Sequence, residues 1–213
     1  PMNSSAASDV YKRQIPYRIY GGLRFYERLE IKNAISYLRV IFNNSDNPSF
    51  ERSISNPTRG VGEKTLNKIR QISKKYNVSY TKASAKLLDE RLISGRGANG
   101  LRDYLDLITG CKQFIEENSL SELMELIIKE SGLYAYHAKE PGEKGKTRTE
   151  NLEELITATK NFEQSIREEK SNIEIAESYL DIISLDSGDR QASEYEDAAQ
   201  LMTMHSAKGL EFK

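Results

Sequence analysis

The chain has 213 residues, of which 38% are hydrophobic and 30% charged, and its formal net charge is −1. This length allows one domain or two small ones with a real core, and the balanced charge excludes a globally basic surface, so any nucleic-acid site must be local. No apolar run approaches the roughly 18 residues that span a bilayer, and no secretory leader is recognisable. The lone Cys111 excludes an internal disulfide and favours a reducing compartment, so we expect a cytoplasmic protein with no membrane partner.

The first and last parts of the chain carry the only strand signals. Residues 1–14 are rich in Ser, Ala and Asn without apolar periodicity, which predicts a disordered segment that we interpret as a non-native leader. Residues 15–20 are β-rich and alternate, which predicts a short strand ended by Gly21 and Gly22. A second alternation, from Leu201 to His205, predicts another short strand.

The middle of the chain is predicted to be helical throughout. Apolar residues at three- and four-residue spacing predict helices over residues 27–42, 64–76, 83–92, 101–115 and 173–183, and two S/T-x-x-E capping boxes, at Ser119 and Thr147, predict two more. Residues 95–100 are expected to be a flexible loop between helices, residues 140–146 an exposed loop, and Cys111 a core residue. We therefore expect a mainly α protein, with a helical insertion between two pieces of one sheet domain.

One candidate site lies in residues 56–66 (NPTRGVGEKTL). A Gly-Val-Gly turn leading into a helix can leave backbone N–H groups open to a phosphate, and neighbouring cations add counter-charge. Such a glycine-hydrophobic-glycine hairpin can hold a duplex backbone without base readout, whereas the alternative is an ordinary tight turn before a helix. The candidate duplex-DNA contacts are Thr58, Arg59, Gly60, Val61, Gly62 and Lys64.

Three further patterns bear on chemistry. Arg18, Gly21 and Gly22 lie among interleaved arginines and aromatics, as in single-strand binding surfaces, although a plain strand-to-helix junction has the same composition. His137 has no Cys, His or carboxylate partner at ligand spacing, so no metal site is predicted. The phosphate-gripping sequence G-x-x-x-x-G-K-[ST] occurs nowhere in the 213 residues.

Four segments, taken in order, resemble the UvrD/Rep/PcrA-type DNA helicases of superfamily 1: IPYRIYGGLRFYERLEIK, NPTRGVGEKTL, KTRTENLEELITA and QLMTMHSAKGLEF. The resemblance covers residues 15–213. It implies an all-helical 2B-type insertion, residues 42–197, between two short α/β pieces of an incomplete RecA-like domain, residues 15–41 and 198–213. We therefore expect the chain to be a fragment containing part of the second motor domain of such a helicase.

The resemblance also assigns roles within the closing segment, which is similar to helicase motif V. By this resemblance Thr203, His205, Ser206 and Lys208 contact single-stranded DNA, with Arg18, Gly21 and Gly22 along the same track. Gly209 and Glu211 would bind ATP in the cleft between the motor domains.

The implied parent protein is an ATP-dependent 3′-to-5′ helicase of repair or replication restart, nucleoid-associated in the cytoplasm. Its cofactors would be ATP and Mg²⁺, and its partners DNA and the first motor domain. Phosphoryl transfer needs a phosphate cradle, metal ligands and an arginine together, and all three are missing here, so we predict that this chain alone hydrolyses no ATP and holds no cofactor stably. The alternatives are a non-motor helical module that binds DNA or a protein partner, and a parent from the related helicase–nuclease branch.

Overall fold

The computed structural model describes residues 17–20, 24–167, 169–186 and 199–202. They belong to two compact units, each of which is described by itself. One unit comprises residues 1–28 with 180–213, and the other residues 29–179. The chain is mainly α-helical, as predicted.

The first unit contains a two-stranded sheet built from opposite ends of the sequence. Strands β1 (Tyr17–Tyr20) and β2 (Ala199–Met202) pair in parallel, with Tyr17 opposite Ala199 and Tyr20 opposite Met202. The first predicted strand is confirmed over residues 17–20, and β2 overlaps the second predicted strand at residues 201–202 and begins two residues before it. The other residues of the two predicted strands lie outside the described part of the chain. A parallel pair needs a crossover connection, and here the whole helical unit lies within that connection. The short helix α2 (Arg24–Glu27) follows β1.

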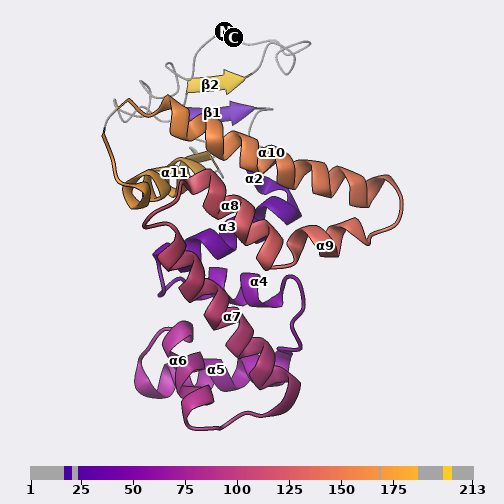
Figure 1. The fold of residues 1–213 in the computed structure, drawn as a ribbon, viewed down its shortest axis with the longest axis vertical. Helices are drawn as coiled ribbons and strands as arrows, with labels where there is room; N and C mark the ends of the chain where they lie inside the picture. The colour runs from indigo at the N-terminus through magenta and orange to yellow at the C-terminus, as the bar shows by residue number, and fades with distance from the viewer. Residues whose placement is uncertain (1–16, 21–23, 168, 187–198, 203–213) are drawn as a thin grey trace. The chain divides into compact units, whose positions relative to one another are not determined.

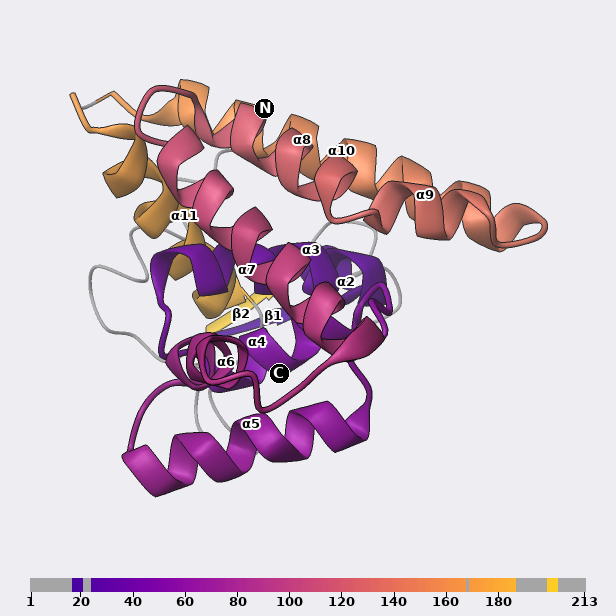
Figure 2. The same ribbon diagram turned by 60° about the horizontal axis from the view of Figure 1, so that its bottom comes forward.

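The second unit is all-helical in its described residues (Figure 1). Its helices are α3 (Leu29–Phe42), α4 (Asn47–Ser55), α5 (Glu63–Tyr76), α6 (Tyr80–Asp89), α7 (Gly95–Phe114), α8 (Leu120–Glu130), α9 (Leu133–Ala138), α10 (Glu143–Ser165) and the first part of α11 (Asn172–Asp186). Helix α3 is central, because it packs against α4, α7, α8 and α10. Helix α7 joins the end that contains α5 and α6 to the end that contains α8, and α5 and α10 lie at opposite ends in both views (Figures 1 and 2).

An aromatic cluster holds α3, α4 and α7 together. The ring of Tyr104 lies 5.2 Å from that of Phe50 and 6.0 Å from that of Tyr37, centroid to centroid. The Tyr104 hydroxyl is 2.6 Å from Ser53 Oγ, and Tyr37 Oη is 2.6 Å from the Ser53 carbonyl oxygen. Burial raises the pKa of both tyrosines well above the ordinary value, so both hydroxyls remain protonated and neutral inside the core.

Several local predictions are confirmed. Ser119 caps α8 and forms the complete capping box with Glu122, and Cys111 is buried on α7. Burial, with a smaller contribution from Glu130, raises the pKa of the Cys111 thiol to about 12. Gly132 follows α8 with a φ of 80°, as expected of a residue that ends a helix.

Two loop predictions were wrong, and glycine packing explains why. Residues 95–100 form the first turns of α7, and α10 begins at Glu143, so most of the second predicted loop and the predicted capping box at Thr147 lie inside a helix. A Cβ atom on Gly145 would overlap the carbonyl oxygen of Glu140, so glycine allows α10 to start against the preceding turn. Turn-like composition here reflects close packing between backbones rather than exposed loops.

The helical unit begins earlier than the predicted insertion. The resemblance implies an insertion at residues 42–197, whereas the helical unit comprises residues 29–179 and includes α3. The predicted domain bounds stay a prediction. Residues 187–197 lie outside the described part of the chain.

Candidate nucleic-acid interface

The predicted duplex-binding segment forms a hairpin, residues 56–62, between α4 and α5. It opens with a cis peptide between Asn56 and Pro57, and Gly60 takes a φ of +75°, in the left-handed region that favours glycine. Val61 is 8% exposed and fixes the tip of the hairpin to the core. Gly62 is the N-cap of α5, and its carbonyl oxygen accepts the first hydrogen bonds of that helix from Thr65 and Leu66.

Arg59 points inward and anchors the hairpin. Its guanidinium donates to the carbonyl oxygens of Ser131 at 2.5 Å and Pro57 at 2.9 Å. The same group lies over the rings of Tyr37 and Tyr104, at 5.4 and 6.0 Å from their centroids. With its donors directed at backbone carbonyls and its face on aromatic rings, Arg59 has a structural role in this geometry, which differs from the phosphate contact predicted for it.

The glycine-rich start of α7 packs directly against the hairpin. A Cβ atom on Gly100 would overlap the carbonyl oxygen of Arg59, and one on Gly97 would lie 2.9 Å from Thr65 Oγ1. Only glycine allows the two backbones to come this close. The first turns of α5 and α7 therefore meet beside the hairpin.

The remaining hairpin candidates face solvent. Thr58, Gly60, Gly62 and Lys64 are all exposed, and nothing lies within 4 Å of a Cβ atom built on Gly62. Because Gly62 offers no side-chain cap to the start of α5, the first N–H groups of this 14-residue helix have no partner from its N-cap side chain. An N–H-rich helix start beside an exposed ammonium suits a phosphate oxygen.

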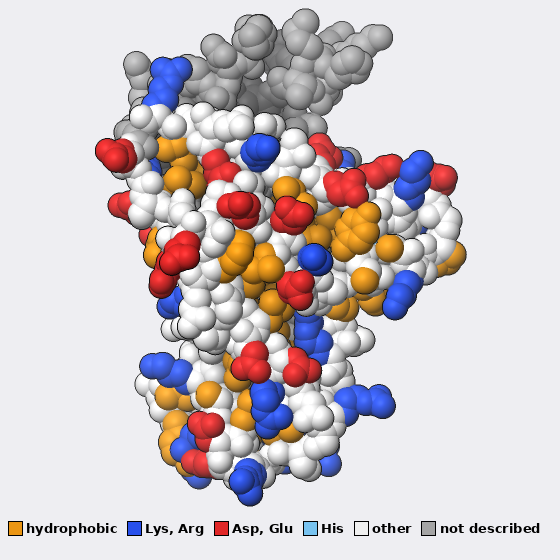
Figure 3. Space-filling model, viewed as in Figure 1, with side chains coloured by type: hydrophobic (Ala, Val, Ile, Leu, Met, Phe, Trp, Pro, Cys, Tyr) orange, Lys and Arg blue, Asp and Glu red, His pale blue; other side chains and the backbone are white. Residues whose placement is uncertain are grey.

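Charge is strongly segregated along the helical unit. Residues 56–102 contain eleven Lys and Arg and three Asp and Glu, which gives a net charge of +8. Residues 103–165 contain seven Lys and Arg and thirteen Asp and Glu, which gives a net charge of −6. We call these segments the basic half and the acidic half. Figure 3 shows many of the Asp and Glu side chains over α8 and α10, and Lys and Arg side chains over α5 and α6. The hairpin thus lies in the basic half, which supplies the local basic surface that the composition required of any nucleic-acid site.

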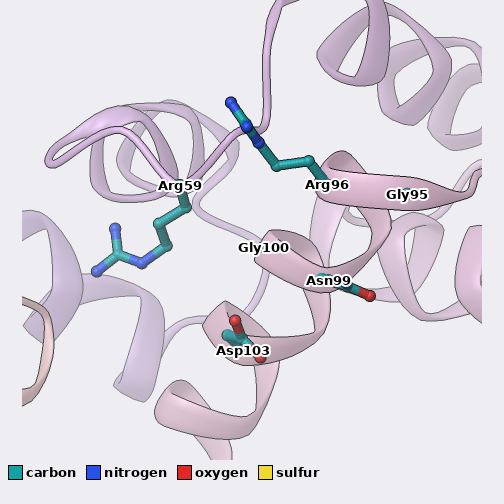
Figure 4. Close-up of a pocket in the computed structure, with 6 residues that line it drawn as sticks. All are labelled: Arg59, Gly95, Arg96, Asn99, Gly100 and Asp103. Carbon is teal, nitrogen blue, oxygen red and sulfur yellow. The ribbon is translucent and has the colours of Figure 1, made fainter.

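A pocket of about 500 Å³ lies where the hairpin meets α7 (Figure 4). Its lining residues are Arg59, Gly95, Arg96, Asn99, Gly100 and Asp103. Because residues 95–100 were predicted to form a loop, Arg96 and Asn99 were not among the predicted site residues. A signal was present in the dense glycines at 95, 97 and 100, two of which, Gly97 and Gly100, lie against the hairpin.

The predicted motif V residues Thr203, His205, Ser206, Lys208, Gly209 and Glu211 lie outside the described residues, as do Gly21 and Gly22. Arg18 is in β1, where the backbone is described, paired with Gln200. These assignments stay predictions.

The prediction that His137 has no carboxylate partner was wrong. This histidine is 1% exposed, and its Nδ1 lies 2.6 Å from Oε1 of Glu140, a carboxylate partner that the sequence reading had not recognised. This hydrogen bond is the main cause that lowers the pKa of Glu140, and Arg148 lowers it further. In the described part of the chain no group of three or more His, Cys, Asp or Glu side chains could hold a metal ion, and no helix there is long and apolar enough to cross a membrane.

Comparison with known proteins identifies close relatives. The family model described as the UvrD-like helicase C-terminal domain matches residues 3–213, which includes most of the segment predicted to be a non-native leader. DNA helicase II of Escherichia coli strain K12 is 46% identical over 203 residues, or 95% of this chain and 28% of the relative. DNA helicase II of Haemophilus influenzae is 43% identical over 199 residues, or 93% of this chain and 27% of the relative. ATP-dependent DNA helicase PcrA of Bacillus subtilis strain 168 is 34% identical over 205 residues, or 95% of this chain and 28% of the relative. The chain thus spans little more than a quarter of the length of these relatives.

Proposed function

This chain belongs to the UvrD-like helicase C-terminal domain family, and we propose that it is part of an ATP-dependent 3′-to-5′ DNA helicase, to which it contributes a duplex-DNA contact and part of the single-strand and ATP sites. The relatives, named as DNA helicase II and ATP-dependent DNA helicase PcrA, support this proposal. ATP and Mg²⁺ are the cofactors of the whole protein, and its partners are DNA and the first motor domain. It acts in the cytoplasm, at the nucleoid.

In this proposal the helical unit contains most of the 2B-type insertion, residues 42–197, and the strand pair belongs to the second RecA-like motor domain. The pairing of β1 with β2 supports the assignment, because a sheet whose strands lie at both ends of the sequence requires an inserted segment between them. The motif V residues 203–212 follow β2 directly, and the proposal assigns them to single-stranded DNA and nucleotide. The carboxylate of Glu211 is suited to accept hydrogen bonds from ribose hydroxyls.

The observation that carries the duplex-binding role is the exposed start of α5 within the basic half. The hairpin is held from inside by Arg59 and Val61, which leaves Gly62 and Lys64 on the surface. A rigid turn that presents backbone N–H groups and one ammonium fits a phosphate backbone and carries no base-reading group. Binding of this kind is independent of sequence and strongly salt-dependent, because it depends on counterion release.

A matched pair of double variants tests this role. Gly62→Ala with Lys64→Ala changes the hairpin, and Gly110→Ala with Lys112→Ala makes the same two changes at the same spacing on α7, in the acidic half. Both glycines have nothing within 4 Å of an added Cβ, and both lysines are exposed, so neither pair disturbs packing. We expect the hairpin variant to bind a fluorescein-labelled 18-bp duplex about tenfold more weakly at low salt in an anisotropy titration, and the control to bind as the unaltered chain does. Equal affinity of the two variants would leave the hairpin an ordinary turn.

The absence of a P-loop sequence gives a second test. With ATP, Mg²⁺ and single-stranded DNA, we expect the purified chain to show no phosphate release above background, because the P-loop sequence that cradles the transferred phosphate is absent from it. The full-length Bacillus subtilis PcrA protein serves as the positive control in the same assay. Turnover by the chain itself would contradict the proposal that it depends on the rest of a helicase.

A further inference from the structure

Arg96 is held beside the hairpin by its aliphatic stem. A Cβ atom on Gly60 would overlap Cγ and Cδ of Arg96, so this stem lies directly on the glycine at the hairpin tip. Gly97, the next residue, contacts Thr65 in the first turn of α5, next to Lys64. Two neighbouring helix starts thus present one exposed cation each, Arg96 and Lys64, on either side of the same contact.

The guanidinium of Arg96 is placed very differently from that of Arg59. Among the described residues it takes part in no hydrogen bond or ion pair that would fix it, whereas Arg59 is held by backbone carbonyls. In the view of Figure 4 the Arg96 side chain extends upward and the Arg59 side chain downward, and Asp103 lies below, away from the Arg96 guanidinium. A carboxylate in the pocket repels phosphate, so an anion would bind at the outer edge of the pocket, where Arg96 is, and not at its base.

We propose that Arg96 is a second contact to the duplex backbone, which acts together with the start of α5, and that the hairpin's own arginine, Arg59, is its structural anchor. This inference rests on the proposed duplex-binding role of the hairpin. It extends the contact surface from one helix start to two, and it gives the glycines of α7 a function: they bring Arg96 close enough to share a ligand with Lys64. A guanidinium is suited to this role because its planar donors match phosphate oxygens.

The test uses Arg96→Gln, because glutamine keeps the Cβ and Cγ of the stem that packs on Gly60 and replaces the charged guanidinium with a shorter, neutral amide. Lys112→Gln is the matched control, since it removes one exposed cation from the same helix about 24 Å further along its axis. The probe is the 18-bp duplex, titrated at several salt concentrations. We expect Arg96→Gln to bind roughly fivefold more weakly and to lower the slope of log K against log salt by about one, with an unchanged thermal unfolding midpoint. Lys112→Gln should match the unaltered chain, and Arg96→Lys should recover most of the affinity.

The outcomes separate this inference from the function on which it rests. If Arg96→Gln binds like Lys112→Gln while the Gly62/Lys64 variant is weakened, Arg96 is no contact and the hairpin proposal stands. If neither variant is weakened, or the unaltered chain binds no duplex, both are overturned. A lower unfolding midpoint of Arg96→Gln with an unchanged salt slope would make Arg96 a packing residue and also overturn the inference.

Discussion

The two halves of the helical unit use their charged side chains in opposite ways. In the basic half, two of the three acids are already paired, Glu63 with Arg70 and Glu90 with Lys86, so a large excess of cations remains on the surface. In the acidic half, Arg148 turns inward to Glu140 and Glu30. The basic half therefore offers charge to a partner, whereas the acidic half uses its arginine for its own stability. The overall net charge of −1 does not reveal this difference, because the charges of the two halves nearly cancel.

The anchoring of the acidic half gives the largest expected effect. The carboxylate of Glu30 is 6% exposed in its side chain and has two partners, Arg148 Nε at 3.6 Å and the Asn151 amide at 2.5 Å. Arg148→Met would leave this buried charge without its cation, so we expect the free energy of unfolding to fall by about 3 kcal/mol, measured by urea denaturation. Lys146→Met, two residues away and 68% exposed, removes only a surface pair and should change stability by no more than about 0.5 kcal/mol. Equal effects would mean that the inward arginine is no more important than a surface lysine.

The packing of the basic half depends on glycine rather than on buried charge. Two glycines of α7 distinguish a glycine that is needed for close packing from one that is not. Gly100→Ala places a methyl group against the Arg59 carbonyl oxygen, whereas Gly110→Ala places one in open space. We expect the first variant to lower the free energy of unfolding by about 2 kcal/mol through overpacking, and to weaken duplex binding because the hairpin shifts. The second should raise the free energy of unfolding by about 0.5 kcal/mol or more, because alanine favours a helix interior. If Gly100→Ala is also stabilising, the close approach of α7 to the hairpin does not exist in solution.

These glycines show what the sequence could and could not predict. Helices with a regular apolar stripe, such as α5, and the capping box at Ser119 were predictable, because they depend on residues close in the sequence. The start of α7 was not predictable, since Gly97 and Gly100 are explained only by their close approach to the start of α5 and to the hairpin, some thirty to forty residues earlier. Composition favours a loop wherever glycine is dense, and it cannot distinguish a flexible turn from a helix packed against another backbone.

The candidate site also has features that the sequence could predict and features that it could not. That residues 56–62 form a glycine hairpin before a helix was predictable from the motif. The sequence could not predict that Arg96 faces outward and Arg59 inward. The inward position of Arg59 is set by Ser131 and by two tyrosines from other helices. A side chain's direction depends on tertiary contacts, and a motif alone assigns residues but not their orientations.

The smallest expected effect concerns Cys111, in the part of α7 that belongs to the acidic half. Burial raises the pKa of its thiol to about 12, above the ordinary value of roughly 9, so the unfolded chain releases this proton more readily than the folded one. The stabilisation is complete below about pH 9 and is lost as pH rises toward 12. Relative to Cys111→Ala, which has no thiol, we expect the unaltered chain to lose about 1 kcal/mol of unfolding free energy between pH 8 and pH 10. Comparing the two proteins at each pH cancels the titration of tyrosines and lysines, and parallel profiles would show that the thiol is open to water in the folded chain.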